Sequence, residues 1–396
     1  MRARSRMELI GVIGAGTMGV GICQIALEAG HEVVVHDVDP GALEAAQVRI
    51  RDGLERRALR LGLDADSIDQ WVEGRFQGLR EADSLDAVAA EADVVIEAAL
   101  EDLELKQTIF GRLDGSSGPE AILATNTSAL SVGAIADATT NPERVLGLHF
   151  FNPAPVMKLV EVVAAPRTRP DLSAAATRLV TNWGKTAVQC ADAPGFIVNR
   201  VNRPFTLEAL RIVDAEEASI EQVDRTVVDA GFPMGPFALM DLVGIDINLA
   251  AARSLYERFG REKRFEPSPT QERLVAEERL GRKTGAGFYR YGADHRAIEP
   301  SEEFAPRTAA GSLSDEDIVD RIVLGVINEA YYALGEKVAS GHDIDLALRL
   351  GAGHPRGPFE RAEDLGGPHV VRERLLRLSA KLGPRFAPAP ALRAEA

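Results

Sequence analysis

The sequence predicts a doubly wound parallel α/β domain followed by duplicated all-α domains, and two observations carry this prediction. In the first half, short β-branched runs alternate with helical stretches, as in sheets whose strands are connected by crossover helices. From about residue 187 onward the pattern becomes helical, and one part of it occurs twice. Because 396 residues exceed what one ordinary hydrophobic core holds, we expect two or three domains.

The composition is that of a globular protein, with 45% hydrophobic and 27% charged residues. No apolar run approaches the roughly 20 residues that span a bilayer, and the basic start MRARSRM leads directly into a strand. Only Cys23 and Cys190 occur, so we expect no disulfide framework and a reducing, cytoplasmic location. The net charge of −15 argues against nucleic acid as a partner. We also expect no association with membranes.

The strongest local motif is ELIGVIGAGTMGVGICQIALEAGHEVVVHDVDP. A strand, the turn G-x-G-x-x-G, a helix and a second strand that ends in an acid follow one another, which is typical of a Rossmann-type dinucleotide site. Gly14 permits the tight turn, Gly16 lets the pyrophosphate approach the backbone, and Gly19 lets helix and strand pack closely. Met18 lies in the same turn and is a further cofactor-binding candidate.

The acid at the end of the second strand favours NAD as the cofactor. Asp37 is placed to accept hydrogen bonds from the adenosine ribose. A 2′-phosphate would be repelled there, because Val38 and Asp39 follow and no arginine does. The alternative, a glycine-rich turn without a ligand, is weakened by the complete strand–turn–helix–strand context.

Polar residues lie at or just beyond the ends of successive predicted strands in the first half: Glu97, Glu101, Asn126, Ser128 and His149. Ligands of parallel α/β sheets bind outside the carboxyl ends of the strands. We therefore expect these groups to converge beside the nicotinamide, although they lie far apart in the sequence.

The stretch HFFNPAPVMKLVE begins with His149 and ends with Glu161. Oxidation of a secondary alcohol needs a base for the hydroxyl proton, and histidine suits this role. If MKLVEVV is a strand that returns past His149, Glu161 could fix the histidine tautomer and stabilise the imidazolium, while Ser128 donates to the substrate hydroxyl. The other reading makes His149 and Glu161 ordinary strand residues, and these two residues alone do not decide between the readings.

Six motifs in order resemble the L-3-hydroxyacyl-CoA dehydrogenase family, of the 3-hydroxybutyryl-CoA dehydrogenase type: GAGTMG, NTSALS, HFFNPAPVMKLVEVV, PGFIVNR, GFPMGPFALMDLVGID and KTGAGFY. The match covers roughly residues 8 to 291. The resemblance implies that His149 is the general base and Glu161 its orienting partner. It also implies that Ser128 and Asn199 hydrogen-bond the substrate oxygens.

The same resemblance implies further cofactor contacts and a substrate class. Glu101 and Lys106 in ALEDLELK match cofactor-contacting positions of the family. The implied reaction is the reversible NAD-dependent oxidation of a (3S)-3-hydroxyacyl-CoA to the 3-ketoacyl-CoA, as in fatty-acid β-oxidation or related acyl-CoA metabolism. No metal is expected. Acyl-chain length, including a preference for dicarboxylic chains, stays open.

The sequence departs from the family where the CoA phosphates bind, because arginines replace the usual lysines and serine. These are Arg49, Arg51, Arg56, Arg57 and Arg60. Arginine recognises phosphate well, so CoA could bind there. Alternatively, the five arginines could simply form the solvent-exposed face of a helix, and this explanation is nearly as good as CoA binding.

The second half contains a repeat. GFPMGPF begins at Gly231 and GHPRGPF at Gly353, 353 − 231 = 122 residues apart, while Glu208 and Glu329 lie 329 − 208 = 121 apart. We therefore predict domains at 7–186 (NAD-binding), 187–291 (first helical copy) and 315–385 (second copy), with a linker at 292–314 and a frayed tail.

The second copy lacks the asparagine of PGFIVNR, so we expect it to be structural. In simple members of the resembled family the helical domains of two subunits pair. A duplicated domain could supply that pairing within one chain, so either a homodimer or a monomer is expected.

Two other functions remain to be weighed. A dehydrogenase of the same fold could act on a free 3-hydroxy acid, such as a sugar acid or carnitine, and would then ignore the CoA portion. Alternatively, the chain could bind NAD without catalysis. The presence of Ser128, His149, Glu161 and Asn199 together argues against that reading.

Overall fold

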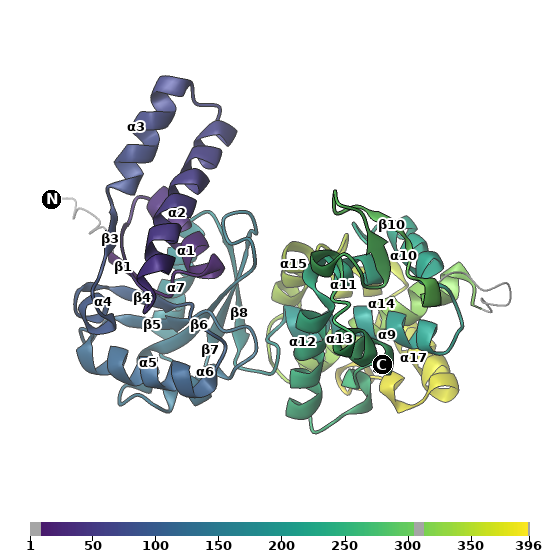
Figure 1. Cartoon of the computed structure of the whole chain (residues 1–396). Coiled ribbons are helices and arrows are strands. Elements are labelled where there is room, and N and C mark those ends of the chain that lie inside the picture. Colours follow the sequence, from purple (N-terminus) through teal and green to yellow (C-terminus); the bar gives the residue numbers. More distant parts are fainter. Residues whose placement is uncertain (1–8, 305–312, 395–396) are drawn as a thin grey trace. The chain divides into compact units, whose positions relative to one another are not determined.

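The computed structural model describes residues 9–304 and 313–394 and divides between Ala193 and Pro194 into two compact units. The basic N-terminal residues and the middle of the predicted linker, 305–312, lie outside the described residues. No described helix is long and apolar enough to cross a membrane. Each unit is presented separately below (Figure 1).

The first unit is built on one eight-stranded sheet with the order β3-β2-β1-β4-β5-β6-β7-β8 (Figure 1). Neighbouring strands pair in parallel except β6 and β7, which are antiparallel. The strands are β1 Leu9–Ile13, β2 Glu32–His36, β3 Leu79–Glu81, β4 Val94–Glu97, β5 Ile122–Thr125, β6 Val145–Phe150, β7 Leu159–Ala164 and β8 Thr186–Ala191. The predicted doubly wound α/β fold is confirmed.

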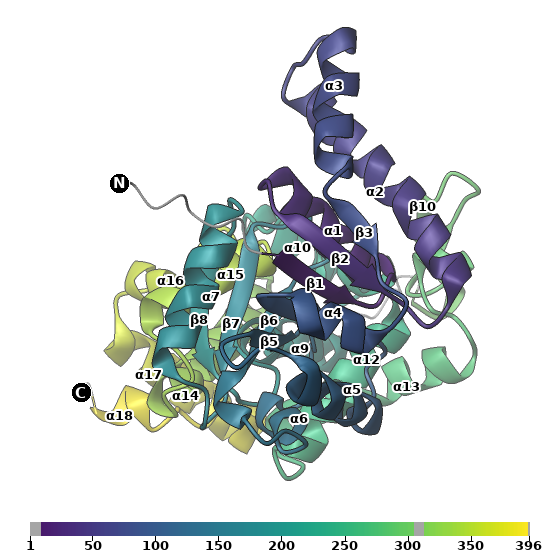
Figure 2. The same ribbon diagram turned by 90° about the vertical axis from the view of Figure 1, so that its left-hand side faces the viewer.

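Most helices of this unit start at a side chain that accepts a hydrogen bond from the first turn, such as Asp64, Ser84, Asp102 and Ser131. They are α1 Thr17–Glu28, α2 Pro40–Arg60, α3 Ala65–Phe76, α4 Leu85–Glu91, α5 Leu103–Ser116, α6 Val132–Ala136 and α7 Pro170–Asn182, with a 3₁₀ turn η1 Pro142–Arg144. The pair α2–α3 extends beyond the sheet, as Figure 2 shows. The apolar face of α1 packs on the β-branched strands of the sheet to form the core.

The predicted boundary after residue 186 is corrected by the structure. Strand β8 begins at Thr186 and pairs with β7 along its whole length. An unpaired β7 edge would expose a row of backbone donors and acceptors, which the added strand satisfies. The first unit therefore extends to Ala193.

The second unit is almost entirely helical, as predicted. Its helices are α8 Val198–Val201, α9 Arg203–Asp214, α10 Ile220–Asp229, α11 Pro236–Val243, α12 Ile245–Arg258, α13 Pro269–Ala276, α14 Asp315–Gly335, α15 Gly341–Gly351, α16 Pro358–Asp364, α17 Pro368–Leu382 and α18 Ala391–Ala394. Short 3₁₀ turns are η2 Lys263–Phe265, η3 Arg282–Thr284, η4 Glu302–Phe304 and η5 Pro384–Phe386, and a hairpin is formed by β9 Tyr289–Tyr291 and β10 Ala297–Pro300.

The two halves of this unit carry matched interactions at the spacing of the sequence repeat. Asp224 accepts a hydrogen bond from the backbone N–H of Phe237 at 2.9 Å, and Asp345 accepts one from Phe359 at 2.8 Å. Each aspartate thus satisfies the N-terminus of the helix that begins with the Gly-Pro-Phe motif. Such paired capping contacts are what a duplication would produce.

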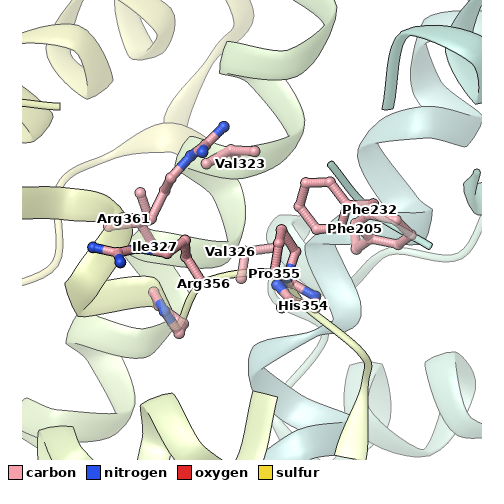
Figure 3. A pocket seen from close by; sticks show the side chains of 10 residues that line it. Phe205, Phe232, Val323, Val326, Ile327, His354, Pro355, Arg356 and Arg361 are labelled. Carbon is pink, nitrogen blue, oxygen red and sulfur yellow. The ribbon is translucent and has the colours of Figure 1, made fainter. Parts of the chain in front are cut away.

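A small apolar cavity lies between residues of the two copies (Figure 3). Phe205 and Phe232 line it from one side and Val326 from the other, beside His354, whose Nε2 lies 2.7 Å from Oδ1 of Asn202. Burial lowers the pKa of His354 to about 4, so the ring is neutral. The cavity volume of about 20 Å³ leaves room for no more than one water-sized group and is too small for a ligand.

The C-terminal tail is ordered, contrary to the prediction that it frays. Phe386, Ala389 and Leu392 are buried, and the backbone N–H of Ala389 donates to Oδ1 of Asn328 on α14 at 2.8 Å. Alanine and proline residues looked like low complexity in the sequence, but their small apolar side chains pack on α14. The second copy therefore extends past residue 385 to α18, and the described start of the predicted linker contains β10 and η4.

Candidate functional site

The glycine turn between β1 and α1 has the shape that a dinucleotide pyrophosphate requires. Gly14 has φ of +102°, and a Cβ atom there would lie 2.6 Å from the carbonyl oxygen of Ala98. A Cβ on Gly19 would lie 1.8 Å from the carbonyl oxygen of Gly14. A Cβ on Gly16, in contrast, would meet nothing within 4 Å. The open side of the turn is therefore at Gly16, which precedes the first N–H groups of α1, and this fits a bound phosphate.

Asp37 lies over this turn at the end of β2. Its Oδ2 accepts a hydrogen bond from the backbone N–H of Ala15 at 2.6 Å, and its Oδ1 accepts one from Asp39 at 3.0 Å. Met18, in contrast, is partly buried against the core. The carboxylate of Asp37 is thus held beside the turn, where a ribose of a bound dinucleotide can reach it.

An arginine from the next helix also reaches the turn, which the sequence did not reveal. Nη2 of Arg49 donates to the carbonyl oxygen of Ala15 at 2.8 Å. Two of the other candidate CoA arginines form ion pairs on the helix surface, Arg51 with Glu73 and Arg57 with Glu28. Arg49 is an exposed residue of α2, and only the packing of α2 shows which backbone atom its guanidinium meets.

The structure brings His149 and Glu161 into direct contact. They are directly opposite one another in the antiparallel pair β6–β7, and Nδ1 of His149 lies 2.6 Å from Oε2 of Glu161. Both side chains are buried, and the ring of Phe151 lies 4.5 Å from the imidazole. A carboxylate at Nδ1 keeps a proton on that nitrogen and directs Nε2 to the other side of the ring.

The loop between these strands is held by a lysine that the sequence did not single out. Nζ of Lys185 donates to the carbonyl oxygens of Ala154 and Met157, at 2.5 Å and 2.9 Å. Burial lowers the pKa of Lys185 to about 8. Ala154 also lies against α1, since a Cβ on Gly21 would come within 3.0 Å of it. The loop is thereby fixed against the helix that begins at the dinucleotide turn.

Glu101 orients the segment that carries Ser128. Its Oε1 accepts hydrogen bonds from Oγ1 of Thr127 at 2.6 Å and from the backbone N–H groups of Ser128 and Ala129 at 2.8 and 3.0 Å. Burial by itself raises the pKa of Glu101, but these hydrogen bonds and the charge of Lys106 outweigh it, so the pKa lies below its usual range. Glu101 is therefore a carboxylate that holds the loop after β5.

Lys106 lies beneath Glu101 and is only 1% exposed. Its Nζ lies 2.6 Å from Oε1 of Glu97 and 3.4 Å from Oε2 of Glu101. The other oxygen of Glu97 accepts from Oγ1 of Thr125 at 2.7 Å. The ammonium group thus binds two carboxylates at the ends of the strands. The sequence offered no signal for Thr125, because an inward-facing threonine in a strand is ordinary.

Ser128 and His149 lie at the carboxyl ends of neighbouring strands. Ser128 is exposed and comes three residues after the end of β5, while His149 lies near the end of β6. Between them, Oδ1 of Asn126 accepts a hydrogen bond from the backbone N–H of Phe150 at 2.9 Å, which ties the two strand ends together. These residues of the first unit therefore lie at the same carboxyl edge of the sheet, while their place beside the nicotinamide stays a proposal.

Asn199 belongs to the second unit, where it lies on α8 between two buried residues, Val198 and Arg200. Arg200 is completely buried and binds Glu329 and Glu336, each at 2.7 Å. The rotation of α8 is thereby fixed. The part of Asn199 in substrate binding stays a proposal. Among the described residues, no cluster of three or more histidine, cysteine, aspartate or glutamate side chains could hold a metal ion.

Family models match both units. The NAD-binding domain of 3-hydroxyacyl-CoA dehydrogenase matches residues 9–193, and the C-terminal domain of 3-hydroxyacyl-CoA dehydrogenase matches residues 195–291 and again 318–394. The two separate matches of the C-terminal model fall on the two parts of the sequence repeat.

Relatives of known name cover most of the chain. It is 36% identical over 444 residues to 3-hydroxyadipyl-CoA dehydrogenase of Escherichia coli K12, with 92% of each chain covered. It is 39% identical over 282 residues to the human mitochondrial hydroxyacyl-coenzyme A dehydrogenase, with 71% of this chain and 90% of the human one covered.

A solved structure matches the whole length. The crystal structure of 3-hydroxybutyryl-CoA dehydrogenase from Escherichia coli K12 superposes with a TM-score of 0.88 at 35% identity and 98% coverage of both chains. The predicted resemblance, fold class and NAD cofactor are thus confirmed. The chain belongs to the 3-hydroxyacyl-CoA dehydrogenase family, the NAD-dependent enzymes that oxidise hydroxyacyl-CoA thioesters.

Proposed function

We propose that this enzyme oxidises a (3S)-3-hydroxyacyl-CoA at C3, reversibly, with His149 as the general base. The contact of 2.6 Å between Nδ1 of His149 and Oε2 of Glu161 carries the proposal. It leaves Nε2 as the ring nitrogen that exchanges a proton with the substrate hydroxyl, and it supplies a negative charge for the imidazolium that forms. Bound NAD would supply the hydride acceptor for C3.

The other proposed roles follow the geometry of the first unit. The glycine turn and α1 would hold the pyrophosphate, and Asp37 would accept from the ribose. Glu101, with Lys106 beneath it, would keep the loop of Ser128 in place, so that the Ser128 hydroxyl can donate to the C3 oxygen. Asn199 is proposed as the second group on the substrate oxygens, by resemblance to the family.

The substrate is proposed to be a thioester rather than a free acid. The Escherichia coli and human relatives are named for CoA thioesters, and the 3-hydroxyadipyl-CoA of the former makes a dicarboxylic chain one candidate. We also propose a cytoplasmic, reducing location, because the chain has only two cysteines, Cys23 and Cys190, and both are buried. Either a homodimer or a monomer in which the duplicated domain replaces a partner subunit is compatible with this proposal.

The first test is the loss of NADH absorbance with acetoacetyl-CoA, beside NADPH and free acetoacetate. We expect rapid turnover with NADH and the thioester only. Replacing His149 with Gln is expected to lower kcat by roughly 10²–10⁴-fold, the usual contribution of a general base. Turnover of free acetoacetate at the same rate, or full activity of H149Q, would contradict the proposal.

A further inference from the structure

Arg203, the first residue of α9, is a buried arginine that has no carboxylate partner among the described residues. It is only 6% exposed. Its side chain makes a single long hydrogen bond there, from Nη1 to the carbonyl oxygen of Asn248 at 3.4 Å, and its buried Nε has no partner in the described part of the chain. Burial lowers the pKa of Arg203 to about 10.

The other buried arginines each have the carboxylate partner that Arg203 lacks among the described residues. Arg144 lies 2.8 Å from Asp114, Arg200 lies 2.7 Å from Glu329, and Arg321 lies 3.2 Å from Glu208. An uncompensated buried charge destabilises a fold by several kcal/mol, which is why such arginines are normally paired. The exception therefore points to an anion that comes from outside the chain.

Arg203 follows Asn199 by four residues on one helical face. Asn202, which separates α8 from α9, keeps helical backbone angles of −80° and −7°, so the two helices continue one into the other. Side chains four residues apart are neighbours on the same face, displaced by about 6 Å along the axis. If Asn199 contacts the C3 oxygen, as the proposed function requires, Arg203 lies about one helical turn farther along.

The second copy shows that the fold itself does not need this arginine. Arg321 and Glu329 stand 121 residues after Arg200 and Glu208, which sets the register. At that spacing Asp320 replaces Asn199 and Leu324 replaces Arg203. Leu324 is buried in α14. The same helical position thus accepts an apolar side chain in the copy that lacks the asparagine.

We propose that Arg203 binds the terminal carboxylate of a dicarboxylic 3-hydroxyacyl-CoA and so determines specificity for that substrate class. A guanidinium group pairs with a carboxylate through two parallel hydrogen bonds, which replaces the missing counter-charge. In a six-carbon chain, three C–C bonds separate C3 from the carboxyl carbon and span about 4 Å, which is close to one helical turn.

The test compares two substrates that differ only at the end of the acyl chain, 3-hydroxyadipyl-CoA and 3-hydroxyhexanoyl-CoA, with the full-length enzyme. The wild type is expected to prefer the dicarboxylic substrate. Arg203→Leu, the residue found in the second copy, should lower the ratio of the two kcat/KM values by roughly 10–10²-fold, the loss of charge-assisted hydrogen bonds. Arg253→Leu, an exposed arginine on α12, is the matched control and should leave the ratio unchanged.

An unchanged ratio in Arg203→Leu, or an equal loss with both substrates, would overturn the inference, since a contact to CoA or a structural role affects both alike. If that variant does not fold, Arg203→Lys provides the test. Lysine keeps the positive charge but lacks the two parallel N–H donors of the guanidinium group, so the ratio of the two kcat/KM values should fall partially. Failure of the proposed function is a separate result, in which the wild type oxidises neither thioester.

Discussion

At His149 the important contact is the one on Nδ1, because it determines which nitrogen can serve the substrate. The carboxylate of Glu161 lies 2.6 Å away and is buried, so water does not screen its charge. Asp37, the proposed acceptor for the ribose, likewise offers a carboxylate that is held against the backbone of Ala15. In the proposed function, single charges at these two residues decide the chemistry and the choice of cofactor.

Replacing Glu161 with Gln should lower kcat by roughly 10²-fold or more, because the amide keeps the shape but supplies no charge to the imidazolium. The measurement is steady-state kinetics with acetoacetyl-CoA and NADH. Glu104→Gln, an exposed carboxylate on α5, is the control and should behave like the wild type. A kcat that does not change in E161Q would mean that Glu161 is only a structural partner.

Replacing Asp37 with Ala should raise KM for NADH roughly 10-fold and reduce the discrimination against NADPH, since the acceptor for the ribose and the repulsion of a 2′-phosphate are both removed. Asp39→Ala removes the neighbouring carboxylate, which caps α2. It should lower stability and leave the KM for NADH unchanged. Equal KM changes in both variants would exclude the specific role of Asp37.

Among the elements, the hairpin β9–β10 is attached to the first helical copy through two buried carboxylates. Asp224 accepts from the Tyr289 hydroxyl at 2.9 Å, and Asp241 accepts from the Tyr291 hydroxyl at 3.0 Å. Burial raises the pKa of each carboxyl to about 6, although backbone and tyrosine hydrogen bonds oppose it. These carboxyls therefore titrate in the folded protein well above their usual range.

The stability of the second unit should respond to pH through Asp224. Its folded pKa of about 6 exceeds the unfolded value of 3.8, so the stabilisation from proton uptake is complete below 3.8 and is lost as the pH rises through 6. Relative to Asp224→Asn, the wild type should gain about 1 kcal/mol in unfolding free energy between pH 7 and pH 5. Urea denaturation at both pH values measures it, with exposed Asp229→Asn as the control. A constant difference would contradict the expectation.

For the whole molecule, the two helical copies are joined by reciprocal buried ion pairs. Arg200 of the first copy binds Glu329 of the second, and Arg321 of the second binds Glu208 of the first. Pairs of this kind fix how two elements fit together, because removing one partner leaves a buried charge. The duplicated domain is therefore one folding unit rather than two.

Glu208→Gln and Glu329→Gln should each destabilise the second unit by about 3–5 kcal/mol. The two tryptophans, Trp71 and Trp183, both lie in the first unit, so their fluorescence reports its unfolding, while far-UV circular dichroism reports mainly helix loss. The helical transition should move to lower denaturant concentration and the fluorescence transition should move much less. Coincident shifts of both signals would show that the two units unfold together.

The sequence by itself determined the parts of this protein that depend on local order. The turn at Gly14, Gly16 and Gly19 follows from backbone sterics, whereas the pairing of His149 with Glu161 was one of two readings, and the antiparallel register of β6 and β7 decided it. The same reason explains why the sheet, the helical half and its repeat could be predicted. Each depends on hydrophobic periodicity or on the spacing of motifs, and both can be read directly from the sequence.

Only the tertiary structure decided which distant groups meet. It placed the ammonium of Lys106 between two carboxylates, moved the domain boundary past β8, and packed the tail on α14. It also showed that Arg203 has no counter-charge in the described chain, a property that no pattern of neighbours can reveal. Burial and charge compensation arise from packing between separate elements, and a linear sequence does not contain those distances.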